Sequence, residues 1–295
     1  MERLAIEVRG LHKRYGEKNV LNGIDLAVPA GTVFALLGRN GAGKTTLIHI
    51  LSTLAAADAG EVRIAGHDLS TDAARVRGAI SLTGQFAAVD AMLTGRENLH
   101  MLCRLSGLSG AASRQRTKQL LTAFDLKDAA DKRVGTYSGG MRRRLDLALS
   151  LVRPKPVLFL DEPTTGLDAM SRRALWAMIR QLREQGMTIF LTTQYLEEAD
   201  ELADQIAVLA EGRLIAAGTA SELKDQLGGA VIEIRGEDDA VLRTIPTDGT
   251  IAGVSRILQE ALRTVPADAR VAIRQPSMED VFLALTEREE EVAVG

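Results

Sequence analysis

The segment GRNGAGKTT, residues 38–46, constrains the fold of this chain more than any other feature. It follows an apolar run at Gly31–Leu37 and opens a stretch, Lys44–Leu54, with the apolar spacing of a helix. Glycines let the backbone curl until several N–H groups converge, and a helix N-terminus adds partial positive charge there. Strand, glycine loop and helix in this order predict a phosphate-binding loop at the edge of an α/β sheet.

The side chains of this loop fit the phosphates of a nucleotide. Lys44 is expected to reach the β- and γ-phosphates, and the Thr45 hydroxyl is expected to bind Mg²⁺. The alternative is a glycine-rich turn that binds nothing, because short motifs recur by chance. The residues expected to hold the nucleotide here are Gly38, Asn40, Gly41, Ala42, Gly43, Lys44, Thr45 and Thr46.

A second apolar strand, Val157–Leu160, ends in two adjacent carboxylates, Asp161 and Glu162. Side chains alternate along a strand, so these two are expected to point in different directions. We expect Asp161 to hold the metal and Glu162 to be the general base toward a water, worth typically about 10²–10⁴-fold in rate. A solvated acidic pair that opens a loop is the alternative, and the upstream glycine loop argues against it.

The motif YSGG, residues 137–140, lies between these segments and opens the helical pattern Met141–Leu151. A Ser-Gly-Gly helix start offers unpaired N–H groups and a hydroxyl, with no bulk to block an anion. A plain serine N-cap would have the same sequence. The order of glycine loop, YSGG and strand-end carboxylates resembles that of the ABC ATPases, whose signature motif is commonly LSGGQ.

This resemblance spans nearly the whole chain and implies an α/β fold. The implied architecture is a P-loop (RecA-like) ABC ATPase core with a β-rich N-terminal subdomain, an inserted α-helical subdomain and a small α+β C-terminal appendage. The nucleotide-binding domain would cover residues 1–227, with the helical subdomain at about 86–153, and an accessory domain would cover 228–295. The implied cofactors are ATP and Mg²⁺.

Several further residues take expected roles from the resemblance. Ser138, Gly139 and Gly140 would bind the γ-phosphate held by a partner subunit. Tyr15 resembles the aromatic residue that stacks on adenine, although a strand-end tyrosine is a plain alternative. Gln85 resembles the hinge glutamine that contacts metal and water and faces the membrane part, with a polar loop residue as its alternative. Asp168 resembles the loop aspartate that couples the two sites of a dimer.

Gln194 departs from the family pattern, which usually has a histidine here, as in TTHYLEEA. Glutamine can hydrogen-bond a γ-phosphate or orient a water, but it cannot carry the imidazolium charge. Hydrolysis is therefore expected to be slower or to depend more on Glu162. No shift of the alignment supplies a histidine, because all four lie in the first third of the chain: His12, His49, His67 and His100.

Gln194, Met141, the stretch SLTGQFAAVDAMLTGRENL and the tail PSMEDVFLALT resemble the daunorubicin-resistance branch of ABC ATP-binding proteins. This implies an exporter ATPase that works as a head-to-tail dimer, expected to be a homodimer. It would pair with a separate integral-membrane permease at the cytoplasmic side of the cell membrane. Import, lipid or polysaccharide export, and a soluble ATP-switched protein acting on ribosomes or DNA remain as alternatives.

Composition limits the partners. The net charge of −3 gives no electrostatic footprint for nucleic acid, so none is expected as a partner. No run approaches the roughly 18 apolar residues that cross a bilayer, so another polypeptide would have to span the membrane. Cys103 is the only cysteine, which rules out an internal disulfide and fits a reducing compartment.

Apolar spacing also predicts the remaining elements. Expected core strands are Leu4–Val8, Asn19–Val28, Glu61–Ile64 and Thr188–Thr192. Expected helices of this part are Glu97–Leu105, Arg114–Phe124 and Ser171–Gln185, the last forming a βαβ unit over Val157–Thr192. In the appendage we expect exposed strands at Val231–Arg235 and Arg270–Gln275, and helices at Ile251–Val265 and Ser277–Thr286.

Overall fold

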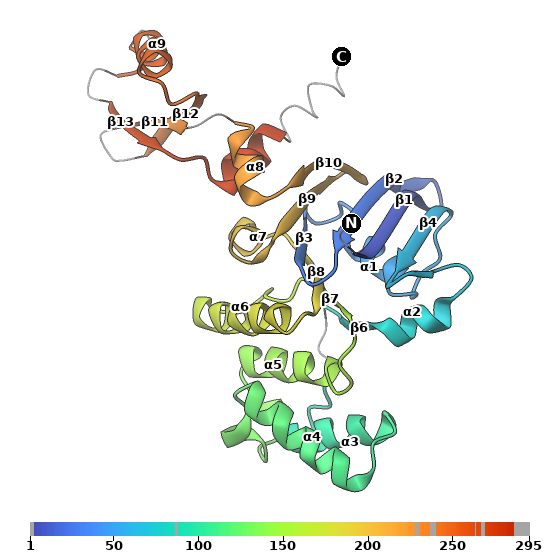
Figure 1. Ribbon diagram of the computed structural model, residues 1–295. Helices are drawn as coiled ribbons and strands as arrows, with labels where there is room; N and C mark the ends of the chain where they lie inside the picture. The colour runs from blue at the N-terminus through green and yellow to red at the C-terminus, as the bar shows by residue number, and fades with distance from the viewer. Residues whose placement is uncertain are drawn as a thin grey trace. The chain divides into compact units, whose positions relative to one another are not determined.

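The structure is a computed structural model that describes residues 3–85, 88–227, 230–236, 240–262, 264–266 and 269–285 (Figure 1). The chain forms two compact units, each described separately below. The first comprises Met1–Asp204 and Leu209–Leu214, and the second Gln205–Val208 and Ile215–Gly295. The domain boundary expected between residues 227 and 228 stays a prediction.

A six-stranded sheet in the order β10-β9-β3-β8-β7-β6 forms the centre of the fold. The neighbours β3 and β8, β8 and β7, and β7 and β6 pair in parallel. Every residue of β3, β7 and β8 is buried, as expected for parallel strands covered on both faces. The strands are β3 (Val33–Leu37), β6 (Ile80–Thr83), β7 (Val157–Asp161), β8 (Thr188–Thr193), β9 (Gln205–Ala210) and β10 (Arg213–Gly218).

The register of the central strands brings their carboxyl ends together. Phe190 of β8 stacks on Phe34 of β3 at 5.3 Å between ring centroids and meets Phe159 of β7 at 5.6 Å. Three residues further along these strands, Leu37 of β3 pairs with Thr193 of β8. The residue before it on β8, Thr192, pairs with Asp161 of β7. The segments that follow β3, β7 and β8 therefore start at one edge of the sheet, where ligands bind in parallel α/β folds.

Helices cover this sheet. The predicted βαβ unit is confirmed as β7, α6 (Ala169–Glu184) and β8, with both strands parallel and adjacent. Helix α1 (Lys44–Leu51) begins at the predicted residue but ends earlier than predicted, because Thr53 takes a left-handed conformation at φ 66°. Two short helices were not predicted, α2 (Ala73–Ala79) and α7 (Leu196–Leu202).

An antiparallel sheet in the order β2-β1-β4-β5 forms the β-rich part of the first unit. Strand β1 continues well beyond the predicted end at Val8, because its pairing with β2 resumes after irregularities on either side of Leu11. The strands are β1 (Leu4–Tyr15), β2 (Lys18–Pro29), β4 (Ala59–Ile64) and β5 (His67–Asp68).

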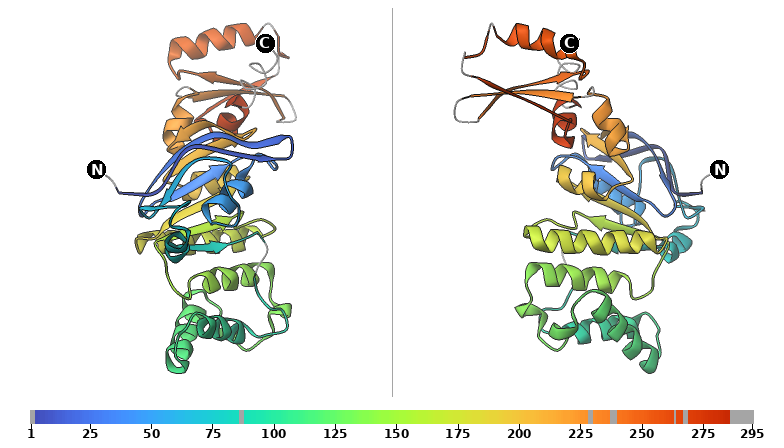
Figure 2. Two further views of the ribbon diagram at one scale, coloured as in Figure 1. Left: turned by 90° about the vertical axis from the view of Figure 1, so that its right-hand side faces the viewer. Right: turned by 60° about the vertical axis from the view of Figure 1, so that its left-hand side comes forward.

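The segment between β6 and β7 is helical, as predicted. Figures 1 and 2 show α3 and α4 at one end of the first unit, with α5 and α6 between them and the sheets. Each of the three inserted helices has a hydroxyl residue as N-cap, Thr94, Ser109 and Ser138, whose side chain accepts a backbone N–H of the first turn. The elements are α3 (Gly95–Leu105), α4 (Gly110–Ala123), α5 (Gly139–Ser150) and the 3₁₀ turns η1 (Lys127–Ala129) and η2 (Val134–Thr136).

The second unit contains a three-stranded antiparallel sheet in the order β12-β11-β13. The prediction of an exposed strand is wrong for β11 (Ala230–Arg235), whose first five residues are buried because it is the central strand and packs on α9 (Ile251–Ala261). It is right for β13 (Arg270–Arg274), which lies at the edge. The unit also contains α8 (Ala220–Asp225), β12 (Val241–Thr247) and a helix at 278–285.

Candidate functional site

Two glycines of the 38–46 segment stand where no larger residue fits. Gly43, the N-cap of α1, has φ 113°, and a Cβ on it would lie 2.8 Å from the Val20 carbonyl oxygen. A Cβ on Gly38 would collide with the Leu209 carbonyl oxygen. The amide of Gly38 donates to the Thr193 carbonyl oxygen at 3.2 Å, which ties the loop to the end of β8. The loop is therefore held close to its neighbours by the absence of side chains.

Lys44 extends through the centre of this loop and is 4% exposed. Its ammonium donates to the carbonyl oxygens of Gly38 at 2.8 Å and Arg39 at 3.2 Å. It also lies 3.2 Å from a carboxylate oxygen of Glu162, the residue that follows β7. One cation thus faces both the glycine loop and the acidic strand end, which brings the first two sequence motifs together.

The two adjacent carboxylates have different partners, although Glu162 lies beyond the last residue of β7 and the alternation of strand side chains does not reach it. Asp161, 2% exposed, accepts hydrogen bonds from the hydroxyls of Thr192 at 2.6 Å and Thr45 at 3.4 Å. Glu162 accepts from the Thr165 hydroxyl at 3.2 Å and pairs with Lys44. Glu162 also has φ 46°, a left-handed conformation that is uncommon for a residue with a side chain and clusters at functional sites.

The oxygen atoms around Asp161 fit Mg²⁺. This ion favours hard oxygen ligands and is usually held by one or two carboxylates together with substrate phosphates and water. Asp161 and Thr45 supply a carboxylate and a hydroxyl beside the glycine loop. Gln85 is exposed and lies two positions after the end of β6. Among the described residues, no group of three or more His, Cys, Asp or Glu side chains could hold a metal without such phosphates.

The segment after β8 contributes Gln194, which is half-buried. Its neighbour Thr193 accepts the Gly38 amide through its carbonyl and the Tyr195 amide, at 2.9 Å, through its hydroxyl. Beneath it lies Glu198, fully buried, to which the indole of Trp176 donates at 3.1 Å. Burial raises the pKa of Glu198, because it disfavours the charged form of the carboxyl. Gln194 thus starts from a firmly held strand end.

The YSGG segment opens α5, as predicted, with Ser138 as N-cap accepting the Met141 amide at 3.2 Å. Ser138 and Gly139 are exposed, whereas Gly140 is buried against Ser171, whose side chain a Cβ at this position would strike. Within the described chain, no hydrogen bond joins this segment to the glycine loop, Asp161 or Glu162. The structure of one chain therefore leaves the third motif outside the cluster that unites the first two.

Asp168 is the N-cap of α6. Its carboxylate accepts the Ser171 amide at 2.8 Å and the Ser171 hydroxyl at 3.0 Å. Both hydrogen bonds lower the pKa of Asp168, because they stabilise its charged form. The hydrogen bond from the Ser171 amide has the larger effect. Since Gly140 also packs on Ser171, Asp168 and the start of α5 belong to one neighbourhood.

Tyr15 is 53% exposed at the end of β1. It pairs with Lys18 where β1 turns into β2, and the ammonium of Lys13 lies 5.1 Å from its ring centroid. Two residues beyond Lys18, Val20 touches the glycine loop at Gly43. The tyrosine is thus an exposed ring on a hairpin that reaches the loop.

Sequence reasoning missed two residues that hold this site together. Thr192 was treated only as part of a strand, yet its hydroxyl donates to Asp161 and accepts the Glu162 amide at 3.1 Å. Arg143, the middle of three successive arginines in α5, is buried and donates to the carbonyl oxygens of Asp161 and Pro163. The signals were a polar residue closing an apolar strand and an arginine three positions before Asp146.

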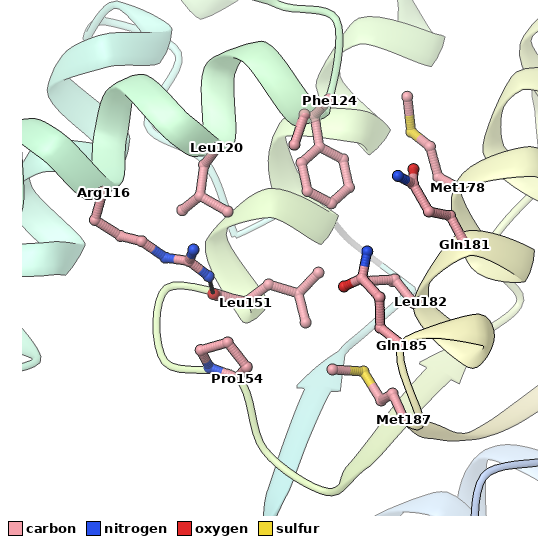
Figure 3. A pocket seen from close by; sticks show the side chains of 11 residues that line it. Arg116, Leu120, Phe124, Leu151, Pro154, Met178, Gln181, Leu182, Gln185 and Met187 are labelled. Carbon is pink, nitrogen blue, oxygen red and sulfur yellow. Dashed lines mark hydrogen bonds between the residues drawn. The ribbon is translucent and has the colours of Figure 1, made fainter.

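A separate groove opens where α4, the end of α5 and α6 meet (Figure 3). None of the residues expected to bind nucleotide or metal lines it. Arg116 donates there to the Leu151 and Val152 carbonyl oxygens, at 2.6 and 3.2 Å, beyond the C-terminal end of α5. The groove is also lined by the polar side chains of Gln181 and Gln185 and by apolar residues that include Leu120, Phe124, Pro154, Met178, Leu182 and Met187.

Known proteins match this chain over the same motifs. The profile of the ABC transporter family matches residues 21–165, which hold the glycine loop, YSGG and both carboxylates. The daunorubicin resistance ATP-binding protein DrrA3 of Streptomyces coeruleorubidus is 48% identical, over 96% of this chain and 96% of that protein. The chain belongs to the ABC transporter family. It is an ABC ATPase, which confirms the resemblance and the α/β fold class inferred from the sequence.

Other relatives of this ABC ATPase agree. The Nod factor export ATP-binding protein I of Burkholderia orbicola is 41% identical over 96% of this chain and 97% of that protein. A solved structure, the ATP-binding subunit of an ABC transporter, is 29% identical over 75% of this chain and 92% of that chain, with a TM-score of 0.66. The ABC ATPase thus binds nucleotide as a subunit of a transporter complex. No described helix in it is both long and apolar enough to cross a bilayer.

Proposed function

We propose that this ABC ATPase uses ATP and Mg²⁺ to power export of a hydrophobic small molecule through a separate integral-membrane permease. Two copies would close head to tail on two ATP molecules, and hydrolysis would reopen them. The observation that carries the proposal is that Ser138 and Gly139 are exposed at a helix N-terminus but form no hydrogen bond with the glycine loop of their own chain. A second copy can bring such an N-terminus to the phosphates.

The residues of the cluster divide the chemistry among them. Lys44 binds the β- and γ-phosphates, while Thr45 and Asp161 supply the protein ligands of the metal. Mg²⁺, when bound, neutralises charge on the phosphates and orients the γ-phosphate. Glu162 holds the attacking water and takes its proton, and its left-handed backbone turns its carboxylate away from that of Asp161 toward Lys44.

The outer residues position the nucleotide and couple the copies. Tyr15 offers its exposed ring to the adenine. Gln194 hydrogen-bonds the γ-phosphate or the water, and Gln85 contacts the metal and faces the permease. Asp168 lies beside Gly140 through Ser171, so it links the γ-phosphate contact of one site to α6. In the closed dimer, Ser138, Gly139 and Gly140 bind the γ-phosphate held by the partner.

The steady-state ATPase rate with Mg²⁺ tests the catalytic part of this proposal. We expect Glu162→Gln to lose about 10²–10⁴-fold in kcat and to accumulate as an ATP-dependent dimer, seen by light scattering. The matched control is Glu197→Gln, an exposed glutamate on α7 that should keep its activity. The proposed dimer would be contradicted if the ATPase rate per molecule did not change with protein concentration and Glu162→Gln formed no ATP-dependent dimer.

Export is tested with membranes. Glu162→Gln, held in its ATP state, should sediment with membranes and co-purify with a polytopic membrane protein. Cells that carry both subunits should then accumulate less doxorubicin, a fluorescent compound, than cells with the Glu162→Gln chain. Recovery of the chain on ribosomes or DNA would support the soluble alternative instead, which the net charge of −3 disfavours.

The cargo has a second candidate, because a relative 41% identical to this chain is named for Nod factor export. A lipid or polysaccharide would then replace the drug-like molecule, with the same ATP chemistry. The ATPase rate in reconstituted vesicles separates the two cargoes. Stimulation by doxorubicin would support the drug-like molecule, and stimulation by a lipid-linked sugar but not by doxorubicin would support the lipid or polysaccharide.

A further inference from the structure

A buried ion pair lies on the inner face of α5, behind the site. Arg143 and Asp146 are 8% and 4% exposed, and their charged atoms are 3.3 Å apart. Taking two charges out of water is costly, so such a pair persists only where further hydrogen bonds satisfy its remaining atoms. The partners of this pair are therefore informative.

The guanidinium of Arg143 donates to three backbone carbonyl oxygens outside α5. They belong to Gly84 at 2.7 Å, Pro163 at 2.8 Å and Asp161 at 3.2 Å. Gly84 directly precedes Gln85, and the other two flank Glu162. The rigid planar fork of arginine thus fixes the two segments that carry the proposed metal contacts and the proposed general base.

The carboxylate of Asp146 contacts the chain on the other side of Gln85. It accepts the amide of Ala88 at 2.8 Å. We call the three described residues Gly84, Gln85 and Ala88 the Gln85 segment. The ion pair therefore binds a residue on each side of Gln85 to α5, the helix whose N-cap is Ser138.

We propose that the Arg143–Asp146 pair is a positioning unit that locks the Gln85 segment and the Asp161–Pro163 strand end to α5. Gln85 then reaches the metal only when α5, and with it the Ser138 N-terminus, takes its matching place. This inference rests on the proposed function and assigns to these two residues the alignment of the metal side of the site. The glycine loop and Lys44 make no hydrogen bond to the pair, so they bind phosphate without it.

A purely structural role would have a different signature, and the chain contains a matched control. Arg144 is the next residue of α5 and is also paired, with the Asp125 carboxylate at 2.7 Å. It too donates to backbone carbonyl oxygens, those of Phe124 and Asp125. Its partners belong to the helical insertion and not to the site. Arg144→Met therefore removes the same kinds of bond without touching the Gln85 segment.

The experiment measures binding of a fluorescent ATP analogue to the full chain, in EDTA and in Mg²⁺, for wild type, Arg143→Met, Arg144→Met and Asp146→Asn. The ratio of nucleotide affinity in Mg²⁺ to that in EDTA should be about tenfold smaller for Arg143→Met than for wild type. Its affinity in EDTA should stay within about twofold of wild type, because the glycine loop is intact. Its kcat should fall about 100-fold, the cost expected of a misplaced catalytic group. Arg144→Met should change neither this ratio of affinities nor kcat.

Asp146→Asn covers the case in which Arg143→Met does not fold. It keeps the side-chain volume and the acceptor for Ala88 but removes the charge that anchors Arg143. We expect it to lose up to about tenfold of the Mg²⁺-dependent affinity, the lower limit of what is typical when a group that orients a metal ligand is changed. Thermal unfolding of each variant measures how much of the chain is folded, so that a loss of affinity is not mistaken for a loss of folded protein.

Four outcomes decide between the possibilities. Equal losses in EDTA and Mg²⁺, for Arg143→Met or Asp146→Asn, would overturn the positioning role. An Arg144→Met chain with the same selective loss would overturn it too. A wild-type chain whose nucleotide affinity is the same with and without Mg²⁺ would instead contradict the proposed function. If the wild type is active and Arg143→Met changes neither the affinities nor kcat, only this inference is contradicted.

Discussion

Two regions of this protein contain buried or half-buried carboxylates, and the side chains around these carboxylates differ. At the end of β7, Asp161 is held by the hydroxyls of Thr192 and Thr45. In the second unit, Arg274 forms ion pairs with both Glu233 and Asp280. Among the described residues Asp161 has hydroxyl partners and no direct ion pair, whereas Asp280 is paired with arginine. The first arrangement is suited to bind a cation, and the second stabilises the fold.

The pKa values in the second unit follow this difference. Burial raises the pKa of Asp280, but hydrogen bonds from Arg274 and from the amide and hydroxyl of Ser277 outweigh it and bring the pKa to about 2. The Arg274 and Arg235 guanidinium groups likewise lower the pKa of Glu233. Both oxygens of each carboxylate in this network accept a charge-assisted hydrogen bond from arginine.

The sharpest test of the comparison replaces a carboxylate at the first region. Asp161→Asn should lower kcat about 100-fold or more, because it removes a charged ligand of the metal. Its thermal midpoint should stay the same or rise, since the change removes a buried carboxylate that has no direct ion pair among the described residues. ATPase assays and thermal unfolding on one preparation measure both. A large drop in the midpoint would show that Asp161 is a structural residue like Asp280.

The second region should respond in the opposite sense. Arg274→Met leaves Asp280 without its cation and Glu233 with Arg235 alone, and it should lower the free energy of unfolding of this unit by about 2–3 kcal/mol. ATPase activity per folded molecule should not change. Hydrogen exchange of the β11 amides reports the loss locally. Arg270→Met, at the exposed start of β13, is the control, and an equal loss there would argue against the network.

Acid should weaken the second unit in a defined window. The folded pKa of Asp280 is about 2, against 3.8 for the ordinary group. Its stabilising contribution is therefore complete above about pH 5 and is lost as pH falls through 3.8 toward 2. A shift of nearly two units corresponds to about 2 kcal/mol. Asp280→Asn should flatten the pH dependence of β13 amide exchange in this window, and an unchanged slope would contradict the assignment.

The smallest effect concerns the residue after β8. Gln194→His should raise kcat by less than about tenfold, since it adds an imidazolium charge beside the γ-phosphate without changing Glu162. The gain should fade as pH rises through about 6.5, the ordinary pKa of histidine. A pH–rate profile measures it, with Gln194→Ala as the control for lost hydrogen bonds. A rate unaffected by either change would remove Gln194 from the proposed chemistry.

Much of the fold could be predicted from sequence, because its signals are local. Helix α5 starts with the Ser138 N-cap, and β7 is a short apolar run that ends in Asp161. The errors came where neighbours decide. Strand β11 alternates like an exposed strand, yet its position between β12 and β13 and under α9 buries it. Helix α1 stopped early because Thr53 takes a left-handed turn that no pattern announced.

The candidate site shows the same division. The order of the glycine loop, YSGG and the two carboxylates already identified an ABC ATPase, because each motif needs only its own residues and their spacing. Three successive arginines, however, look alike in sequence. Arg142 is exposed, Arg144 contacts the helical insertion and only Arg143 turns inward to three backbone carbonyl oxygens. Their partners lie far along the chain, so the packing of α5 on β6 and β7 decided which arginine belongs to the site.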